Sequence, residues 1–140
     1  MSVLKILRRN ERGAAAIEMA IALPVLLVMI YGIFQVGLVF QANAGMQHAL
    51  GEGARLETLC VPTANGCNAP ADSAVVTRMQ SKLFGMKIGA FGTPTVTTPA
   101  AATCTNCRLL TVTYSVTPNY LFYNGRPITL TRTKLVHIAH

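Results

Sequence analysis

The feature that most constrains the fold of this chain is an uncharged apolar run near its beginning. No Asp, Glu, Lys or Arg occurs from residue 19 to residue 51, and residues 14–40 are almost continuously apolar. A helix needs about 20 apolar residues to cross the hydrocarbon core of a membrane, so this run is long enough for one span. A surface helix of a soluble protein would instead show a polar face. The sequence therefore predicts a single membrane-spanning helix.

Four basic residues precede this run and predict its orientation. Basic residues beside a first span normally stay in the cytoplasm. We therefore expect a cytoplasmic N-terminus, one crossing of the inner (cytoplasmic) membrane, and a C-terminal part on the periplasmic or extracellular side. The four residues are Lys5, Arg8, Arg9 and Arg12.

The composition fits a membrane or an assembly better than an isolated soluble domain. Hydrophobic residues make up 51% of the 140 residues and charged residues 12%, whereas soluble domains have about 25% charged residues. The formal net charge is +7, but the basic residues cluster before the span and are scattered elsewhere. The chain has no Trp, and its aromatic residues do not interleave with a basic stripe as a base-stacking surface requires. We therefore expect no nucleic-acid partner.

A secretory signal peptide is one interpretation of the N-terminal region. Such a peptide has a basic start, an apolar stretch and a cleavage site with small residues, for which residues 42–44 (Ala-Asn-Ala) are suited. The apolar stretch is about twice as long as a signal peptide allows, and it contains an acid, Glu18. A membrane anchor fits the sequence better.

The same region has the pattern of a different processing site. A basic leader ends at Gly13, four small or apolar residues follow, and Glu18 then precedes the long apolar run. This pattern resembles the type IV pilin-like proteins that prepilin peptidases recognise. More narrowly, the segments ERGAAAIEMAIALPVLLVMIYGIFQVG, HALGEGARL and LTVTYSVTP are similar to the TadE/TadG-like proteins of tight-adherence (Flp) pilus systems.

The resemblance implies a processing site, a role and partners. Cleavage would fall between Gly13 and Ala14, so that Ala14 begins the mature chain. The protein would be a minor pilin or pseudopilin, a structural subunit that contributes to pilus assembly and surface attachment. Its partners would be other pilin-like subunits in a homo- or hetero-oligomer, prepilin peptidase, the inner-membrane assembly platform and membrane lipid. We expect no cofactor and no metal.

Glu18 is the residue of the apolar run that most needs an explanation. An ionisable group in lipid costs several kcal/mol unless it is paired or protonated, so such residues usually mark a partner or a function. Cleavage after Gly13 would create an ammonium group on Ala14, which lies one helical turn from Glu18. The resemblance implies that Glu18 can also neutralise the amine of a neighbouring subunit. In the alternative, Glu18 pairs with Arg12 or reaches the lipid headgroups.

Pro24 lies inside the predicted span. Proline removes one backbone donor and disturbs the preceding turn of a helix. The sequence therefore predicts a kink or local melting of the helix near residues 20–24.

The helical pattern continues beyond the span as an amphipathic segment. Apolar residues recur there at intervals of three and four, which predicts one buried face. They are Ala42, Met46, Ala49, Leu50, Gly53 and Leu56. His48, Glu52 and Arg55 fall on the opposite side. The sequence thus predicts one helix over residues 14–58, with its first half in the membrane and its second half under a head domain.

The remaining residues predict a small α+β head. Residues 60–70 have the composition of a loop. A second helix follows, capped by Asp72 or Ser73, with an apolar stripe of Val76, Met79, Leu83 and Met86. Gly89, Gly92, Pro94 and Pro99 are expected to interrupt regular structure.

Two later segments alternate apolar and polar residues and predict antiparallel strands. They begin near Leu109 and near Ile128, with Asn124-Gly125 as a tight reversal between them. Residues 93–98 are a possible third strand. The sheet should pack on the amphipathic half of the long helix. We expect a basic leader at 1–13, the helix at 14–58 and an extracytoplasmic α+β head at 59–140.

Four cysteines, Cys60, Cys67, Cys104 and Cys107, fall in the predicted extracytoplasmic part. Disulfides are the default in an oxidising compartment. The sequence permits three pairings, and short separation favours Cys60 with Cys67 and Cys104 with Cys107. C-x-x-C also suggests a redox or zinc site, but a redox motif needs a strand-to-helix context and a four-cysteine zinc site prefers two C-x-x-C pairs.

No catalytic constellation stands out in the sequence, so we expect no enzyme. The leading hypothesis is the pilin-like subunit. The second is an uncleaved single-span anchor whose outer domain binds another envelope component. The third is a membrane-tethered thiol oxidoreductase that uses Cys104 and Cys107.

Overall fold

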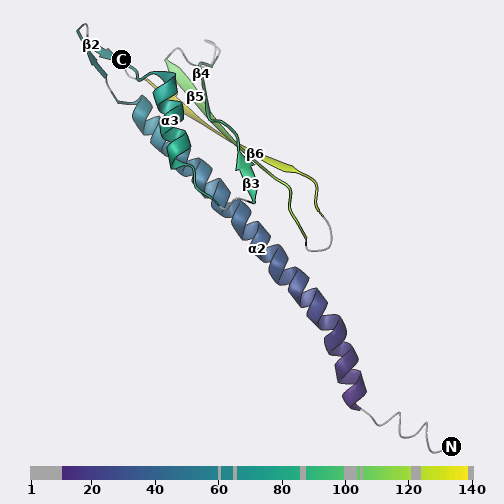
Figure 1. Cartoon of the computed structure of the whole chain (residues 1–140). Helices are drawn as coiled ribbons and strands as arrows, with labels where there is room; N and C mark the ends of the chain where they lie inside the picture. The colour runs from purple at the N-terminus through teal and green to yellow at the C-terminus, as the bar shows by residue number, and fades with distance from the viewer. Residues whose placement is uncertain are drawn as a thin grey trace, which may run out of the picture.

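The computed structural model describes residues 11–59, 61–64, 66–85, 88–99, 104, 106–120 and 124–138. One long helix, α2 (Glu11–Glu57), runs the length of the protein, and a small head packs against its C-terminal half (Figure 1). At a rise of 1.5 Å per residue this helix is about 70 Å long. The predicted α+β class, a long N-terminal helix with a small antiparallel sheet, is confirmed.

The C-terminal half of α2 is amphipathic, as its spacing predicts. Ala42, Met46 and Ala49 are fully buried, and Leu50 is almost so. His48 and Arg55 are exposed on the other side. Burial of this face against the head stabilises the second half of a helix whose first half has no such support.

A short hairpin follows α2 where the sequence predicted a loop. Strands β1 (Val61–Thr63) and β2 (Gly66–Asn68) pair antiparallel. Gly66 has a φ of +124°, a backbone conformation that suits glycine. The loop prediction was wrong because turn-forming residues are as compatible with a tight hairpin as with irregular structure.

Helix α3 (Asp72–Lys82) lies beside α2. Its buried residues are Val75 and Met79, while Val76 and Leu83 pack against the core partly buried. The predicted stripe is therefore confirmed at Met79, and Val75 was missed. Neither Asp72 nor Ser73 caps the helix: the N-cap is Ala71, without a side-chain hydrogen bond. Asp72 is instead the first helical residue and pairs with Arg108.

The end of α3 also differs from the prediction. Leu83 is the C-cap residue, so the helix ends before the apolar repeat does. Met86, which completed that repeat, lies outside the described residues.

The sheet is built around one central strand. β5 (Cys107–Val116) pairs along its whole length with β6 (Ile128–His137), and its other edge pairs with two short strands, β3 (Gly89–Phe91) and β4 (Thr95–Thr97). All pairings are antiparallel. Strand β4 falls within the predicted third strand, whereas β3 was not predicted.

The segment from β3 to β4 is one edge strand interrupted by a bulge. Phe91 pairs with Tyr114 and Thr95 with Thr111, so three residues oppose two on β5. A residue inserted in this way kinks an edge strand. Pro94, which has no N–H to donate, lies at this interruption. Gly89 was wrongly expected to interrupt regular structure, since it is the first residue of β3.

The connection between β5 and β6 reverses before the predicted turn. Asn119 pairs with Asn124 as an isolated bridge, and the Gly125 N–H donates to the Pro118 carbonyl at 2.7 Å. Asn124 and Gly125 therefore lie on the returning side of the connection. The prediction of a two-residue turn at Asn124-Gly125 was wrong, because Asn124 is paired with Asn119 and therefore lies beside the turn, not in it.

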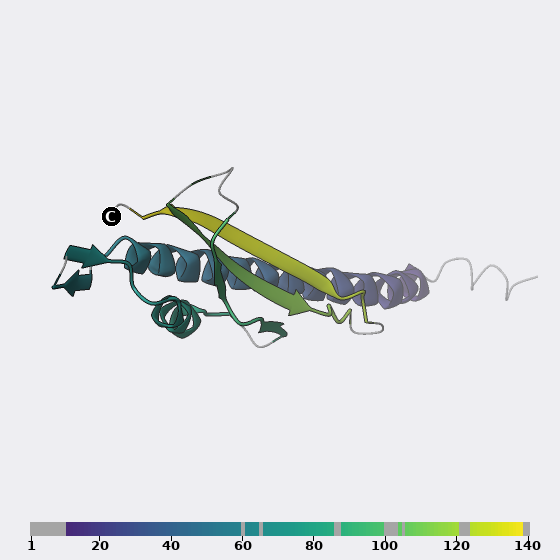
Figure 2. The same cartoon turned by 90° about the horizontal axis from the view of Figure 1, so that it is seen from above.

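One face of the sheet covers the amphipathic half of α2, as predicted. Strands β5 and β6 lie across this part of the helix and α3 lies beside it (Figure 2). Alternate β5 residues point into the core, and these are Leu110, Val112, Tyr114 and Val116. They meet Met46, Leu50 and Met79 in a single cluster of buried apolar side chains.

Candidate functional site

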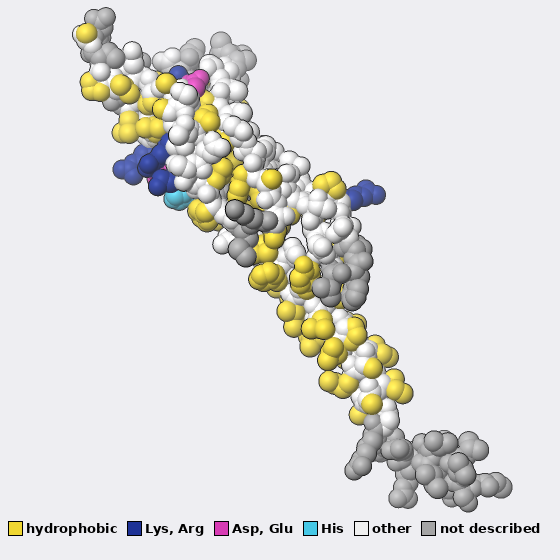
Figure 3. Space-filling view, viewed as in Figure 1, with side chains coloured by type: hydrophobic (Ala, Val, Ile, Leu, Met, Phe, Trp, Pro, Cys, Tyr) yellow, Lys and Arg dark blue, Asp and Glu magenta, His cyan; other side chains and the backbone are white. Residues whose placement is uncertain are grey.

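The N-terminal half of α2 is an apolar surface that the rest of the described protein leaves uncovered. Residues 13–30 are all exposed, and hydrophobic side chains cover this half of the helix in the space-filling view (Figure 3). In its most apolar window only 11% of the residues are buried, at a mean hydropathy of 2.3. By length and composition the helix can cross a membrane. A core helix of a soluble protein would be mostly buried.

Gly13, Ala14 and Glu18 lie on the exposed surface of the first turns of α2. Nothing in the described protein lies within 4 Å of a Cβ built on Gly13. Ala14 and Glu18 are four residues apart in continuous helix and so share one face. Glu18 also borders an open apolar depression with Ala22, Val25 and Met29. A carboxyl group thus stands among apolar side chains, one turn from the predicted new N-terminus.

The basic residues that predict orientation lie largely outside what the structure describes. Lys5, Arg8 and Arg9 precede its first described residue, and for Arg12 the structure describes the helical backbone only. The pairing of Arg12 with Glu18 therefore stays an alternative hypothesis.

Helix α2 passes through Pro24 without a break, so the residues around it remain helical. Local melting near residues 20–24 is not what the structure shows. A change in the direction of the helix axis at Pro24 stays a prediction.

Comparison with known proteins finds a family match over most of the long helix. Residues 13–55 match the family described as TadE-like protein. This segment of the chain is TadE-like. The resemblance proposed from the sequence is therefore confirmed over the span and most of the packed half of α2. No curated protein and no solved structure matched the chain.

The TadE-like segment argues against the signal-peptide interpretation. The match extends over residues 42–44, where a signal peptide would be cut. Ala42 is fully buried in the core, and the Asn43 side-chain oxygen accepts a hydrogen bond from Arg132 Nε at 2.7 Å. Cleavage there would remove part of the head's own core.

The TadE-like segment ends just before an ionic cluster that joins three elements around one buried acid. Glu57 at the end of α2 is 0% exposed, and Arg108 Nη1 on β5 lies 3.3 Å from its Oε1. The same guanidinium contacts Asp72 at the start of α3 and the Pro70 carbonyl at 3.5 Å. Glu57 Oε2 has no hydrogen-bond partner in the described protein. Arg108 is therefore the cation that compensates a buried acid.

From the sequence Asp72 was expected only as a possible helix cap, and Glu57 had no assigned role. The sequence could have indicated that Glu57 is buried, because it continues the buried stripe of α2, four residues after Gly53. An acid on a buried face requires a basic partner. The sequence does not reveal that this partner is Arg108, which lies far along the chain on another element.

A second ion pair lies on the outer surface between the two helices. Arg78 Nη2 on α3 donates to Glu52 Oε2 on α2 at 2.6 Å. This hydrogen bond and the positive charge of Arg78 hold the pKa of Glu52 below its ordinary value. Because Arg78 is about half exposed, solvent screens the pair and it contributes little to stability.

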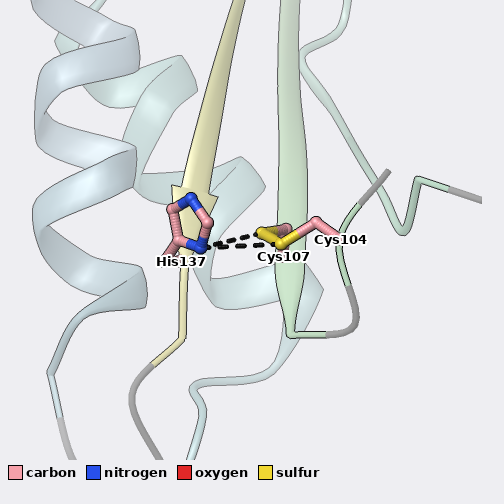
Figure 4. The surroundings of a disulfide bond; sticks show 3 residues. All are labelled: Cys104, Cys107 and His137. Carbon is pink, nitrogen blue, oxygen red and sulfur yellow. Dashed lines mark hydrogen bonds between the residues drawn. A yellow bond between two sulfur atoms is a disulfide. The ribbon is translucent and has the colours of Figure 1, made fainter. Parts of the chain in front are cut away.

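The structure joins Cys104 to Cys107 in a disulfide at the beginning of β5 (Figure 4). This is one of the two local pairings favoured by sequence separation. Cys60 and the side chain of Cys67 lie outside the described residues, so their pairing stays a prediction. In the β1–β2 hairpin, Cys67 pairs through its backbone with Pro62.

His137 on β6 faces this disulfide, which the sequence did not indicate. Its Nδ1 lies 3.1 Å from Cys107 Sγ and 3.5 Å from Cys104 Sγ. The pairing of Cys107 with His137 in the β5–β6 ladder places the ring there. The three side chains are close enough to hold a metal ion, but sulfurs bonded to each other are not available as thiolate ligands.

The surroundings of the disulfide do not match a thioredoxin-like centre. Such a centre places its cysteine at a helix N-terminus, which lowers the pKa of the thiol. Here Cys107 is the first residue of a strand and is 2% exposed. A bond of this kind is suited to holding the beginning of β5 in place.

Tyr114 provides a pH-dependent prediction for the head. Its side chain is fully buried, and its hydroxyl, near the backbone of Gly89, makes no hydrogen bond of ordinary geometry to the described residues. Burial raises the pKa of Tyr114. The folded state therefore favours the protonated phenol, and this contribution to stability is present below about pH 10, the ordinary pKa of tyrosine, and is lost as pH rises further.

We expect Tyr114→Phe to change the free energy of unfolding by less than about 1 kcal/mol at neutral pH, because the lost hydroxyl has no partner. Above about pH 10 the wild-type protein should lose more stability than the variant. Urea unfolding of both proteins in detergent across this range measures the difference. Parallel curves would show that Tyr114 is not buried as described.

Proposed function

We propose that this chain is a structural pilin-like subunit, a minor pilin or pseudopilin, of a tight-adherence pilus system. The TadE-like match indicates association with such a system. The observation that carries the proposal is the exposed apolar half of α2 with Glu18 as its single acid after the Gly13–Ala14 junction. An uncovered apolar helix requires lipid or other apolar helices around it.

In this proposal residues 1–13 are a cytoplasmic leader that prepilin peptidase removes. The junction is open to an enzyme, since Gly13 and Ala14 are exposed and lie in the first turn of α2. Glycine also weakens a helix, which makes unwinding of that turn easier. Helix 14–58 then anchors the head, residues 59–140, outside the inner membrane.

Cleavage gives Glu18 a positive partner. The new ammonium group of Ala14 lies one turn away within the chain, and in an assembly the amine of an adjacent subunit can take its place. Either pairing offsets the several kcal/mol that an ionised carboxyl group costs in lipid. The proposed partners are therefore other pilin-like subunits, with the inner-membrane assembly platform and the peptidase acting on the precursor.

N-terminal sequencing of the protein made together with its prepilin peptidase tests the processing step. We expect Ala14 as the first residue, and we expect Gly13→Leu to leave the leader attached. A wild-type protein that keeps Met1–Gly13 in the membrane would instead support the uncleaved single-span anchor.

The role of Glu18 is tested in the sheared pilus fraction. Glu18→Gln keeps the size of the side chain but removes its charge, so we expect cleavage to continue and incorporation into the pilus to be lost. Glu52→Gln, which changes an acid of α2 beyond its apolar half, is the matched control and should assemble normally. Equal incorporation of both variants would rule out charge pairing by Glu18.

A further inference from the structure

The level at which α2 leaves the membrane follows from its length. If Ala14 marks the inner edge, about 20 helical residues cross the hydrocarbon core and the helix emerges near Phe34. Tyr31 and Gln35 lie at this level, where Gln35 Nε2 donates to the Tyr31 hydroxyl at 3.0 Å. Tyrosine is enriched where a helix meets the membrane surface. Residues 35–40 therefore lie at the level of the lipid headgroups, provided that the proposed membrane insertion is correct.

One end of the β5–β6 hairpin lies at this same level. Strand β5 runs antiparallel to α2, since its Arg108 contacts Glu57 while its Val116 lies near residues 35–40. The hairpin therefore extends from the head toward the apolar half of the helix (Figure 1). The described parts of its connection and the first residue of β6 therefore lie near the proposed membrane surface.

A groove of about 170 Å³ lies between the helix and this end of the hairpin. Its walls are almost entirely apolar. They are formed by Gln35, Val36, Val39, Phe40, Val116, Pro118, Tyr120 and Ile128. Phe40 is 68% exposed and Ile128 is 44% exposed, so apolar side chains on both walls face outward. The groove is continuous with the uncovered apolar surface of α2.

We propose that this end of the hairpin is a second lipid contact, in which the groove accommodates an acyl chain at the outer surface of the membrane. Continuity with the span and position at the headgroup level favour lipid as the occupant. Arg126, exposed two residues before Ile128, adds a positive charge to this end of the hairpin. An arginine there can reach anionic headgroups while its apolar stem lies against the lipid.

The absence of Trp from the sequence allows single-Trp probes in the full chain. We would place the full chain in vesicles of phosphatidylcholine and phosphatidylglycerol whose acyl chains carry bromine near the headgroup. Ile128→Trp and Phe40→Trp report on the two walls of the groove. Leu135→Trp is the matched control, since Leu135 is 42% exposed on the same strand but about 24 Å further along it. Phe34→Trp reports on insertion of the helix itself.

We expect loss of Trp fluorescence for the Ile128→Trp, Phe40→Trp and Phe34→Trp proteins and full emission from Leu135→Trp. Quenching of Phe34→Trp alone would overturn the second lipid contact and leave the proposed span intact. Emission of the groove probes that is shifted to the blue but not quenched would also overturn it, because a second protein copy would then cover the groove. Unquenched Phe34→Trp would overturn the proposed insertion and this inference together.

The contribution of Arg126 has its own readout. In vesicles with phosphatidylglycerol, Arg126→Glu should reduce quenching of the Ile128→Trp probe by repelling the anionic surface, and in vesicles of phosphatidylcholine alone it should not. If Arg126→Glu leaves quenching of the Ile128→Trp probe unchanged in both kinds of vesicle, Arg126 takes no part in the contact.

Discussion

Replacement of Arg108 by methionine is expected to destabilise the head by about 3 kcal/mol, the lower end of the cost of removing one partner of a buried ion pair, because Glu57 is buried but Arg108 is 22% exposed. Glu57 is 0% exposed, and Arg108 is the cation within 4 Å of it in the described protein. The variant leaves the acid in the core without compensation. It also removes the contact that ties the start of α3, through Asp72, to β5.

The matched control is Arg78→Met. Arg78 also pairs with a glutamate of α2, but its side chain is 46% exposed, and loss of a surface pair costs about 1 kcal/mol or less. Urea unfolding of the full chain in detergent gives both free energies. The double variant Glu57→Leu with Arg108→Met should recover most of the loss, because neither buried charge remains. Equal losses for Arg108→Met and Arg78→Met would contradict the burial of Glu57.

Gly45→Ala is expected to destabilise the protein by roughly 2–3 kcal/mol, a large cost for one added methyl group. A Cβ at Gly45 would collide with the backbone carbonyl of Phe84, just beyond α3. Backbone cannot move aside as a flexible side chain can. The variant should therefore push the end of α3 away from α2. It should also loosen the contact between the rings of Phe84 and His48, whose centroids lie 5.6 Å apart.

Gly51 provides the control on the same helix. Nothing lies within 4 Å of a Cβ at Gly51, and alanine is about 1 kcal/mol more favourable than glycine inside a helix. Gly51→Ala should thus stabilise the protein, while Gly45→Ala destabilises it. The measurement is the same urea titration, with hydrogen exchange of α3 as a local readout. A stabilising effect of both substitutions would show that α2 and the chain beyond α3 do not approach closely at Gly45.

The parts of the fold that the sequence predicted are those with a long, regular pattern. The apolar run and the stripe from Ala42 to Leu56 identify α2, because a helix repeats every 3.6 residues and buries one face. The alternation from Leu110 to Val116 identifies β5, because a strand repeats every two. The TadE-like motif around Gly13 and Glu18 is likewise local, so it can be recognised without a structure.

What the sequence did not predict depends on pairing between distant segments. Strand β3 contains only Gly89–Phe91, too few residues to show the two-residue alternation of a strand. It forms because it can pair with the free edge of β5. The approach of His137 to Cys107 depends on the register of the β5–β6 ladder, which the composition of the connection did not fix. The link from Glu57 to Arg108 requires α2 and β5 to be antiparallel neighbours. Local patterns contain no information on any of these contacts.

The continuity of α2 from the apolar surface into the head core has a mechanical consequence. The two halves belong to one continuous helix, so a rotation or tilt of the membrane half also rotates or tilts the sheet. Neighbouring subunits that pack against the apolar half would thereby set the direction in which each head points. Insertion of a flexible segment near Gly37 should leave both halves folded and abolish this shared orientation.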